Sequence, residues 1–176
     1  MGDPKKARKK YSTPRHPWEK NRLEEEKVLM RDYGFKNKKE LWRVSSLLKS
    51  YYTRAKQYIT RVTPQSQKEQ KQLIDKLRSL GLLKGDATVD KILDIQLTDL
   101  MERRLQTIVF KKKMAHSISQ ARQFITHCHI SVDGKKITSP SYIVSLEEES
   151  QLFFSETSSL ANEEHPERAL PEKNEA

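Results

Sequence analysis

The chain has one cysteine, five glycines and no long apolar run, and each shortage excludes a class of protein. A single cysteine excludes an internal disulfide and any zinc site built from several thiolates. The few glycines form no phosphate-binding loop, and no serine nucleophile elbow or pair of catalytic carboxylates is recognisable. No apolar segment approaches the roughly 20 residues that span a bilayer, and the first residues have no signal-peptide core. We therefore expect a soluble, intracellular protein that is not an enzyme and needs no cofactor.

Basic side chains are abundant and gather in two segments. Lysine and arginine number 34 against 24 acidic residues, a formal net charge of +10 that favours a polyanion as partner. Residues 1–62 carry 18 basic and 7 acidic side chains and residues 101–144 carry 8 and 2, whereas residues 145–176 carry 2 and 9. Nucleic acid is the expected partner. An anionic membrane is the alternative if a basic helix exposes a bulky apolar face.

Two helices are expected first in the chain, after a basic arm at residues 1–16. Pro17 suits the first turn of a helix that ends at Gly34, and Asn37-Lys38-Lys39-Glu40 resembles a capping box that starts a second helix. The apolar positions of the second helix recur every three or four residues, at Leu41, Val44, Leu48, Tyr51, Ala55, Tyr58 and Val62. Long basic side chains lie off this stripe, where they can reach phosphates.

Three more helices are expected before residue 111. Thr63-Pro64 predicts a helix start and Gly81 its end. A short helix is expected over residues 89–93 and a longer one over residues 99–110. In the longer helix, Arg103 is expected to point away from the apolar side and Arg104 to lie at its edge.

Residues 117–137 predict a helix followed by a β-hairpin. Ser117-Ile118-Ser119-Gln120 reads as a second capping box, and Ile118, Ala121, Ile125 and Cys128 share one face, so we expect Cys128 to be buried. Asp133-Gly134 is a strong hairpin signal between strands at 130–132 and 135–137. Further extended segments are expected around residues 142–144 and 152–153, and a polar tail after Ser155.

The sequence His127-Cys128-His129 raises the alternatives of a metal site and of a catalytic cysteine. A zinc site would combine these residues with His116, but successive side chains point in different directions and do not converge easily on one ion. A catalytic thiol needs an exposed, electropositive setting, whereas the helical phase places Cys128 on the apolar face. We expect neither site.

The segment LMERRLQTIVFKKKMAHSISQARQFITHCHISVDGKKITSPSYIV, residues 100–144, closely resembles the S4 RNA-binding domain. With the upstream helices, the ERRLQT run and the tail LANEEHPERALPE, nearly the whole chain resembles the archaeal form of the small-ribosomal-subunit protein S4 family. The resemblance implies a primary binder of small-subunit ribosomal RNA that acts in subunit assembly and translational accuracy near the mRNA entry site. The implied neighbours are ribosomal proteins S5 and S3 and the mRNA.

Two positions depart from the pattern of that family. Ile118 stands where bacterial members commonly carry an arginine, and Cys128 stands where glycine or a small residue is frequent. Some bacterial relatives also have an N-terminal zinc-binding cysteine cluster, which this chain lacks, so we expect its N-terminal region to fold without metal.

The expected fold is α+β, with a helical N-terminal region and an S4 domain of helices packed on a small antiparallel sheet, between a disordered basic N-terminus and an acidic C-terminal tail. The expected domains are the arm at 1–16, a helical domain at 17–100 that continues after the inserted S4 domain at 101–155, and the tail at 156–176. The residues expected to bind RNA are Lys5, Lys6, Arg8, Lys9, Lys10, Arg43, Arg54, Arg61, Arg103, Arg104, Lys111, Lys112, Lys113, Ser117, Ser119, Gln120, Arg122, Gln123, His127, Lys135 and Lys136.

Two rival functions use the same surfaces. The S4 domain also accompanies RNA-modifying enzymes and tRNA synthetases, but the 32 residues after Val144 are too few and too polar for a catalytic domain. A regulator that binds messenger RNA, including its own, is the second rival. The acidic tail is expected to lie in solvent or against the basic surface of a neighbouring protein.

Overall fold

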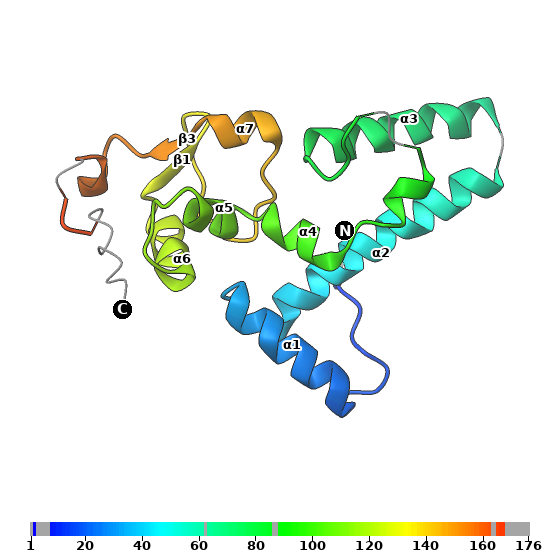
Figure 1. The fold of residues 1–176 in the computed structure, drawn as a ribbon, viewed down its shortest axis with the longest axis horizontal. Coiled ribbons are helices and arrows are strands. Elements are labelled where there is room, and N and C mark those ends of the chain that lie inside the picture. Colours follow the sequence, from blue (N-terminus) through cyan, green and yellow to red (C-terminus); the bar gives the residue numbers. More distant parts are fainter. Residues whose placement is uncertain (1, 3–7, 62, 86–87, 163–164, 168–176) are drawn as a thin grey trace, which may run out of the picture.

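The computed structural model describes residues 2, 8–61, 63–85, 88–162 and 165–167, shown in Figure 1. Its helices are α1 (Lys20–Asp32), α2 (Lys38–Thr60), α3 (Pro64–Ser79), α4 (Leu97–Glu102), α5 (Leu105–Lys111), α6 (Ile118–Thr126) and α7 (Leu146–Ser150). Two 3₁₀ turns, η1 (Asp90–Ile92) and η2 (Ser159–Ala161), and three strands, β1 (Ile130–Val132), β2 (Lys135–Lys136) and β3 (Leu152–Phe154), complete it. Within these ranges no helix is long and apolar enough to cross a membrane.

Helix α2 is the axis of the N-terminal half. Six of its seven predicted stripe positions are confirmed: the first five, from Leu41 to Ala55, are buried, and Tyr58 packs against the same core. The seventh, Val62, lies outside the described residues. Helix α1 crosses the start of α2, α3 returns antiparallel along its second half, and α4 leaves it toward the C-terminal half (Figure 1). One amphipathic helix thus organises the packing of three others, because burial of its apolar stripe stabilises all three contacts.

Several helix boundaries follow the local signals. Thr63 caps α3 by accepting a hydrogen bond from the amide of Ser66 at 3.1 Å, with Pro64 in the first turn, and Gly81 follows α3 with φ +72°. The expected place of Pro17 in the first turn of a helix is wrong, because α1 begins three residues later, at Lys20; Gly34, with φ +60°, follows the helix as expected.

The predicted capping box at Asn37 is wrong. Asn37 is the N-cap residue of α2, but its side chain makes no capping hydrogen bond, and the Glu40 carboxylate does not return to it. Glu40 instead binds two arginines that lie 64 and 82 residues further along the chain. For the Glu40 carboxylate, hydrogen bonds from two charged guanidinium groups are more favourable than a single hydrogen bond from the Asn37 amide.

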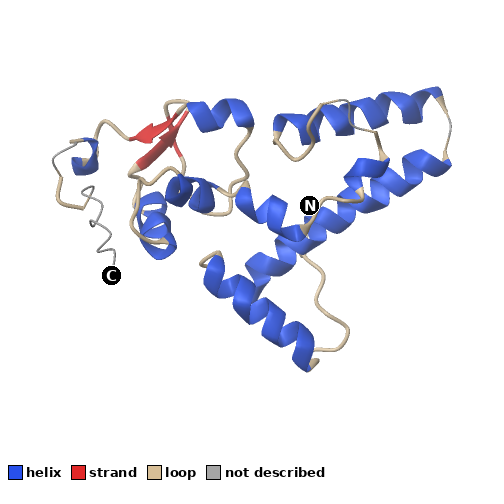
Figure 2. Cartoon of the chain, viewed as in Figure 1, coloured by secondary structure: helices blue, strands red, loops and turns tan. Residues whose placement is uncertain are grey.

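The strands form one antiparallel sheet in the order β2-β1-β3, drawn as arrows in Figure 2. The predicted hairpin is confirmed: Val132 pairs with Lys135 across Asp133 and Gly134, whose φ values of +51° and +69° fit a two-residue turn. Residues 152–154 add the third strand. Residues 142–144 do not join the sheet, and Ile143 forms an isolated bridge with Arg104.

Two hydrophobic clusters meet between α4 and α5. The first contains the apolar faces of α2, α3 and α4 and ends in sequence at Met101. The second begins at Leu105 and contains α5, α6, the inner face of the sheet and Leu160 of η2. The packed part of the chain therefore continues five residues past Ser155. The α+β architecture with a small antiparallel sheet is confirmed, while the domain boundaries stay a prediction.

The single helix expected over residues 99–110 is wrong. It is two helices, α4 and α5, separated at Arg103 and Arg104, where Arg104 is extended (φ −73°, ψ 141°). The expected place of Arg104 at the edge of a helix is wrong as well, because its side chain is only 1% exposed. At the break the Arg104 side chain is buried against Phe35, a member of the first cluster.

The expected burial of Cys128 is also wrong. Helix α6 ends at Thr126, and Cys128 is exposed with a left-handed φ of +64°. The amide of His129 donates to the carbonyl of Phe124 at 2.9 Å and the amide of Cys128 to that of Ile125 at 3.1 Å, the two bonds of a Schellman motif. The helical phase does not extend to a residue that has already left the helix.

Candidate nucleic-acid interface

Three arginines of the expected set form one exposed stripe along α2. Arg43, Arg54 and Arg61 are all exposed. Arg43 and Arg54, 11 residues apart, lie within about 20° of one another around the helix axis, and Arg61 is the C-cap residue directly after the end of the helix at Thr60. This stripe lies to the side of the buried one, so the helix packs on the core with one face and offers cations with another.

The S4-like half presents a polar face on α6. Ser119, Gln123 and His127 are exposed and follow one another at four-residue spacing on one side of the helix. Ser117, at the N-cap, accepts from the amide of Gln120 at 3.1 Å, which confirms half of the second capping box. The Gln120 side chain accepts from the amide of His116 at 2.7 Å, one residue before the cap.

Two short loops carry the lysines of this half. At the end of α5, Lys111, Lys112 and Lys113 are exposed, and Lys111 pairs with Glu102 at 3.1 Å while Lys112 donates to the carbonyl of Glu149. In the hairpin, Lys135 and Lys136 are both exposed.

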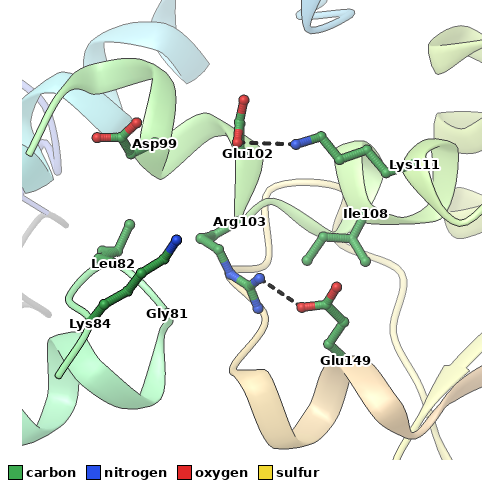
Figure 3. Close-up of a pocket in the computed structure, with 9 residues that line it drawn as sticks. All are labelled: Gly81, Leu82, Lys84, Asp99, Glu102, Arg103, Ile108, Lys111 and Glu149. Atoms are coloured by element: carbon green, nitrogen blue, oxygen red, sulfur yellow. Dashed lines mark hydrogen bonds and ion pairs between the residues drawn. The ribbon is translucent and has the colours of Figure 1, made fainter.

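Arg103 is held inside a pocket between the two halves. Its side chain is 14% exposed and donates to Glu149 at 2.7 Å and to the carbonyl of Val144 at 3.0 Å. Figure 3 shows Arg103 pointing across the pocket to α7, next to the Lys111–Glu102 pair. The expected exposed position of Arg103 is therefore wrong, and its guanidinium ties α7 to the start of α5.

Glu40 binds Arg104 and Arg122 together. Arg122 Nη2 and Nη1 donate to the two Glu40 oxygens at 2.6 and 3.1 Å, and Arg104 Nη2 donates at 3.3 Å. Arg104 also lies over the Phe35 ring, 4.0 Å from its centroid. The expected outward orientation of Arg122 is wrong, because its side chain is only 23% exposed and faces α2.

The pKa values in this cluster follow from burial and charge. Burial lowers the pKa of Arg104 to about 10, although the Glu40 carboxylate favours its charged form. Burial alone would raise the pKa of Glu40, but the hydrogen bonds and charges of Arg122 and Arg104 outweigh it and hold this pKa below its ordinary value. All three groups are charged at neutral pH, so the cluster carries one net positive charge.

The described part of the basic arm lies along α2. The Tyr11 ring packs on Trp42 with centroids 6.1 Å apart, and the amide of Ser12 donates to Ser46 Oγ at 3.0 Å. Arg8, Lys9 and Lys10 are exposed just before this contact. Lys5 and Lys6 lie outside the described residues.

A buried carboxylate fixes α1 on α2. Glu26 is 7% exposed and accepts hydrogen bonds from Arg22 and from Trp42 Nε1 at 3.1 Å, and Lys38 Nζ lies 3.0 Å from it. Burial would raise the pKa of Glu26, but these three donors together lower it. Sequence reasoning did not single out Glu26 and assigned Glu40 to a capping box. The partners that decide their roles are distant in the chain: Trp42 and Lys38 for Glu26, and Arg104 and Arg122 for Glu40.

The histidines beside Cys128 form no metal cluster in the described residues, where no group of three His, Cys, Asp or Glu side chains is placed to hold an ion. His129 Nδ1 is 2.7 Å from Ser158 Oγ, and its ring packs edge-on against Phe124. These contacts give His129 a structural role at the end of α6.

Comparison with known proteins shows which family the sequence matches. Residues 103–150 match the family model described as "S4 domain". A protein named "Small ribosomal subunit protein uS4" from Methanococcus aeolicus is 46% identical over 169 residues, which cover 96% of each chain. The chain belongs to the uS4 family of small-ribosomal-subunit proteins.

Other members of the uS4 family match over similar lengths. A protein from Ignicoccus hospitalis named "Small ribosomal subunit protein uS4" is 47% identical over 90% of this chain and 95% of its own length. One of the same name from Thermoplasma acidophilum is 47% identical over 94% of this chain and 85% of its own length. Membership in the uS4 family confirms the expected archaeal-type resemblance and the S4 domain. It also agrees with the expectation of a protein that is not an enzyme, because these relatives are named as ribosomal proteins.

Proposed function

We propose that this uS4-family protein is a structural component of the small ribosomal subunit in the cytoplasm and binds its ribosomal RNA directly. The observation that carries the proposal is the near full-length match to uS4 proteins together with two exposed cationic surfaces in separate halves of the fold. Folded RNA is recognised mainly through its shape and backbone, which suits a broad basic surface without a deep binding pocket.

The proposed interface has two parts. The first is the arginine stripe of α2, Arg43, Arg54 and Arg61, with the arm residues Arg8, Lys9 and Lys10. The second contains the polar face of α6 and the lysines of the α5–α6 turn and of the hairpin. Arg103, Arg104 and Arg122 are left out, because largely buried guanidinium groups that bind carboxylates do not reach a phosphate in this conformation.

The finer role follows the family resemblance. We propose early binding to small-subunit ribosomal RNA during assembly, a place near the mRNA entry site beside ribosomal proteins S5 and S3, and an influence on translational accuracy. The acidic C-terminal segment suits a basic neighbouring protein better than RNA, because carboxylates repel phosphates. Crosslinking within purified small subunits would identify these neighbours directly.

The first experiment measures binding of the full chain to a small-subunit ribosomal RNA transcript across a range of salt concentrations. We expect affinity to fall steeply with salt, with a slope that reports the number of phosphates contacted. The double variant Arg54→Ala/Arg61→Ala removes two charges from the proposed interface and should weaken binding and lower the slope by about two.

The matched control removes two charges elsewhere. Lys68 and Lys71 are exposed on α3, outside the proposed interface, so Lys68→Ala/Lys71→Ala should leave both affinity and slope near the wild-type values. Equal losses from the two double variants would mean that only the overall charge matters, and the proposed interface would be wrong.

A second experiment separates the ribosomal role from the rival of a messenger-RNA regulator. Sedimentation of cell lysate at low and high salt, followed by sequencing of crosslinked RNA, should place the protein with the small subunit and its ribosomal RNA. A protein that sediments alone with crosslinks to scattered messages or tRNA would contradict the proposal.

A further inference from the structure

The outer face of the sheet carries an aromatic side chain that the described part of the chain leaves uncovered. Phe153 of β3 is 63% exposed, whereas Leu152 before it is buried and Phe154 after it packs against the second cluster. Adjacent side chains of a strand point to opposite faces, so Phe153 points away from the core. An apolar ring held in this way has its face available to a partner.

A serine and a lysine stand beside Phe153 on the same face. Ser131, in the central strand, pairs with Phe153 on one side and with Lys136 on the other, so the three side chains form a row across the sheet. Strands lie about 4.8 Å apart, which places the two outer positions about 10 Å from each other with a small residue between them. Ser131 Oγ donates to the carbonyl of Phe153 at 3.2 Å and stays low on the surface.

The lysine in this row keeps its charge unneutralised. Lys136 Nζ donates to Thr157 Oγ1 at 2.8 Å, and no carboxylate pairs with it among the residues the structure describes. Its neighbour Lys135 has Asp133 at 3.8 Å, a loose and exposed pair. The row therefore offers an aromatic face and an ammonium group side by side.

We propose that this row binds an unpaired nucleotide of RNA, with the base stacked on Phe153 and an adjacent phosphate held by Lys136. The inference rests on the proposed RNA-binding function and adds to it a contact that is not electrostatic. Proteins bind unpaired bases by stacking them on aromatic side chains of exposed sheets, and pair the backbone with nearby cations. A protein partner fits less well, because the cores of protein interfaces are depleted of lysine and rich in contiguous apolar surface.

The test compares variants of the full chain in binding to the small-subunit ribosomal RNA transcript. Phe153→Ala should weaken binding at least about five-fold, the lower end of the loss of one stacked base, without changing the salt slope. Lys136→Ala should instead lower the slope by about one. Phe153→Tyr keeps a stacking ring and should bind like the wild type.

Two further variants serve as controls. Phe153→Leu keeps an apolar side chain of strand-compatible size but has no aromatic face, so it should lose affinity as Phe153→Ala does. Ile59→Ala removes another exposed apolar side chain, which is 48% exposed on α2, and should have no effect. Urea unfolding of each variant confirms that the binding measurements compare folded proteins.

The outcomes separate this inference from the proposed function. If the wild type does not bind the transcript, the proposed function is wrong. If the wild type binds and Phe153→Ala binds equally well, the nucleotide subsite alone is wrong. If Phe153→Leu binds as tightly as the wild type, the side chain makes a general apolar contact and the proposed stacking is wrong. A photoreactive phenylalanine at position 153 should crosslink to RNA in assembled subunits, and a crosslink to a protein would overturn the inference.

Discussion

Glu40 in the first turn of α2 binds Arg122 of α6 through two parallel hydrogen bonds of 2.6 and 3.1 Å, across 82 residues of sequence. The same carboxylate accepts from Arg104, which is almost completely buried. These contacts join the helical half to the S4 domain.

Removal of the Glu40 charge should destabilise the fold. In Glu40→Gln the buried Arg104 and the half-buried Arg122 lose their common counter-ion, and breaking such a pair costs on the order of 3 kcal/mol. Urea unfolding measures the loss. Glu102→Gln is the matched control, because the Glu102–Lys111 pair is about half exposed and should contribute about 1 kcal/mol or less. Equal stability of the two variants would contradict a structural role for Glu40.

Acid should weaken the same junction. The pKa of Glu40 is lower in the folded protein than its ordinary value near 4.5, so its ionisation stabilises the fold above that value, and the contribution is lost as pH falls through the lowered pKa. The free energy of unfolding should therefore decrease as pH drops below about 4.5. Glu40→Gln should show a shallower decrease than the wild type, and parallel pH profiles would refute this assignment.

Arg122→Ala tests two roles at once. We expect the RNA affinity of the folded variant to stay near the wild-type value, because both Nη atoms of Arg122 bind Glu40; a loss of about 1 to 3 kcal/mol would instead show that Arg122 contacts a phosphate. Because Arg122 is the main partner of Glu40, stability should fall, and less than additively when combined with Glu40→Gln. RNA affinity is compared under conditions where both proteins are folded. An unchanged affinity would leave Arg122 with a purely structural role.

Substitutions at Cys128 should reveal its backbone conformation. A left-handed residue with a side chain costs roughly 1 to 2 kcal/mol relative to glycine, so Cys128→Gly should raise stability by up to about that amount. Cys128→Ser should change stability by less than about 0.5 kcal/mol, because the thiol is exposed. Thermal or urea unfolding distinguishes the two, and a large loss in Cys128→Ser would show that the thiol is packed after all.

Gly34→Ala and Gly134→Ala separate backbone strain from close packing. Both glycines have left-handed φ angles, +60° and +69°. A Cβ at position 34 would overlap the Ile118 side chain and approach Gln106 Nε2 to 2.7 Å, whereas a Cβ at position 134 would meet nothing within 4 Å. Both variants should lose roughly 1 to 2 kcal/mol from strain. Gly34→Ala should lose a further 1 to 3 kcal/mol or so from overpacking. Equal losses would mean that the contact relaxes freely.

The sequence predicts those parts of the fold that depend on neighbouring residues. The stripe of α2, the Thr63 cap and the Asp133-Gly134 turn all follow from spacing or from the preferences of one or two residues. The membership of Phe153 in a strand was predicted in the same way. Its exposure was not, because alternation alone does not say which face is buried.

The wrong predictions have a different cause. Glu40 has the right spacing for a capping box, and nothing local reveals that Arg104 and Arg122 will compete for it. Arg104 follows the helical phase only if the helix continues, whereas at the break between α4 and α5 its backbone forms a bridge with Ile143, a residue distant in the chain. At Cys128 a signal did exist: the glycine common at this position in the family indicates a left-handed residue, which excludes the helical interior.

The contact between Glu40 and the two arginines also bears on the thermodynamics of RNA association. Two basic surfaces joined by a flexible linker would lose orientational entropy when both engage one RNA. Here α2, with its arginine stripe, and α6, with its polar face, are joined in the folded protein by the ion pairs of Glu40. The ordering of the two halves is completed during folding, so more of the contact energy remains as affinity when the RNA is bound.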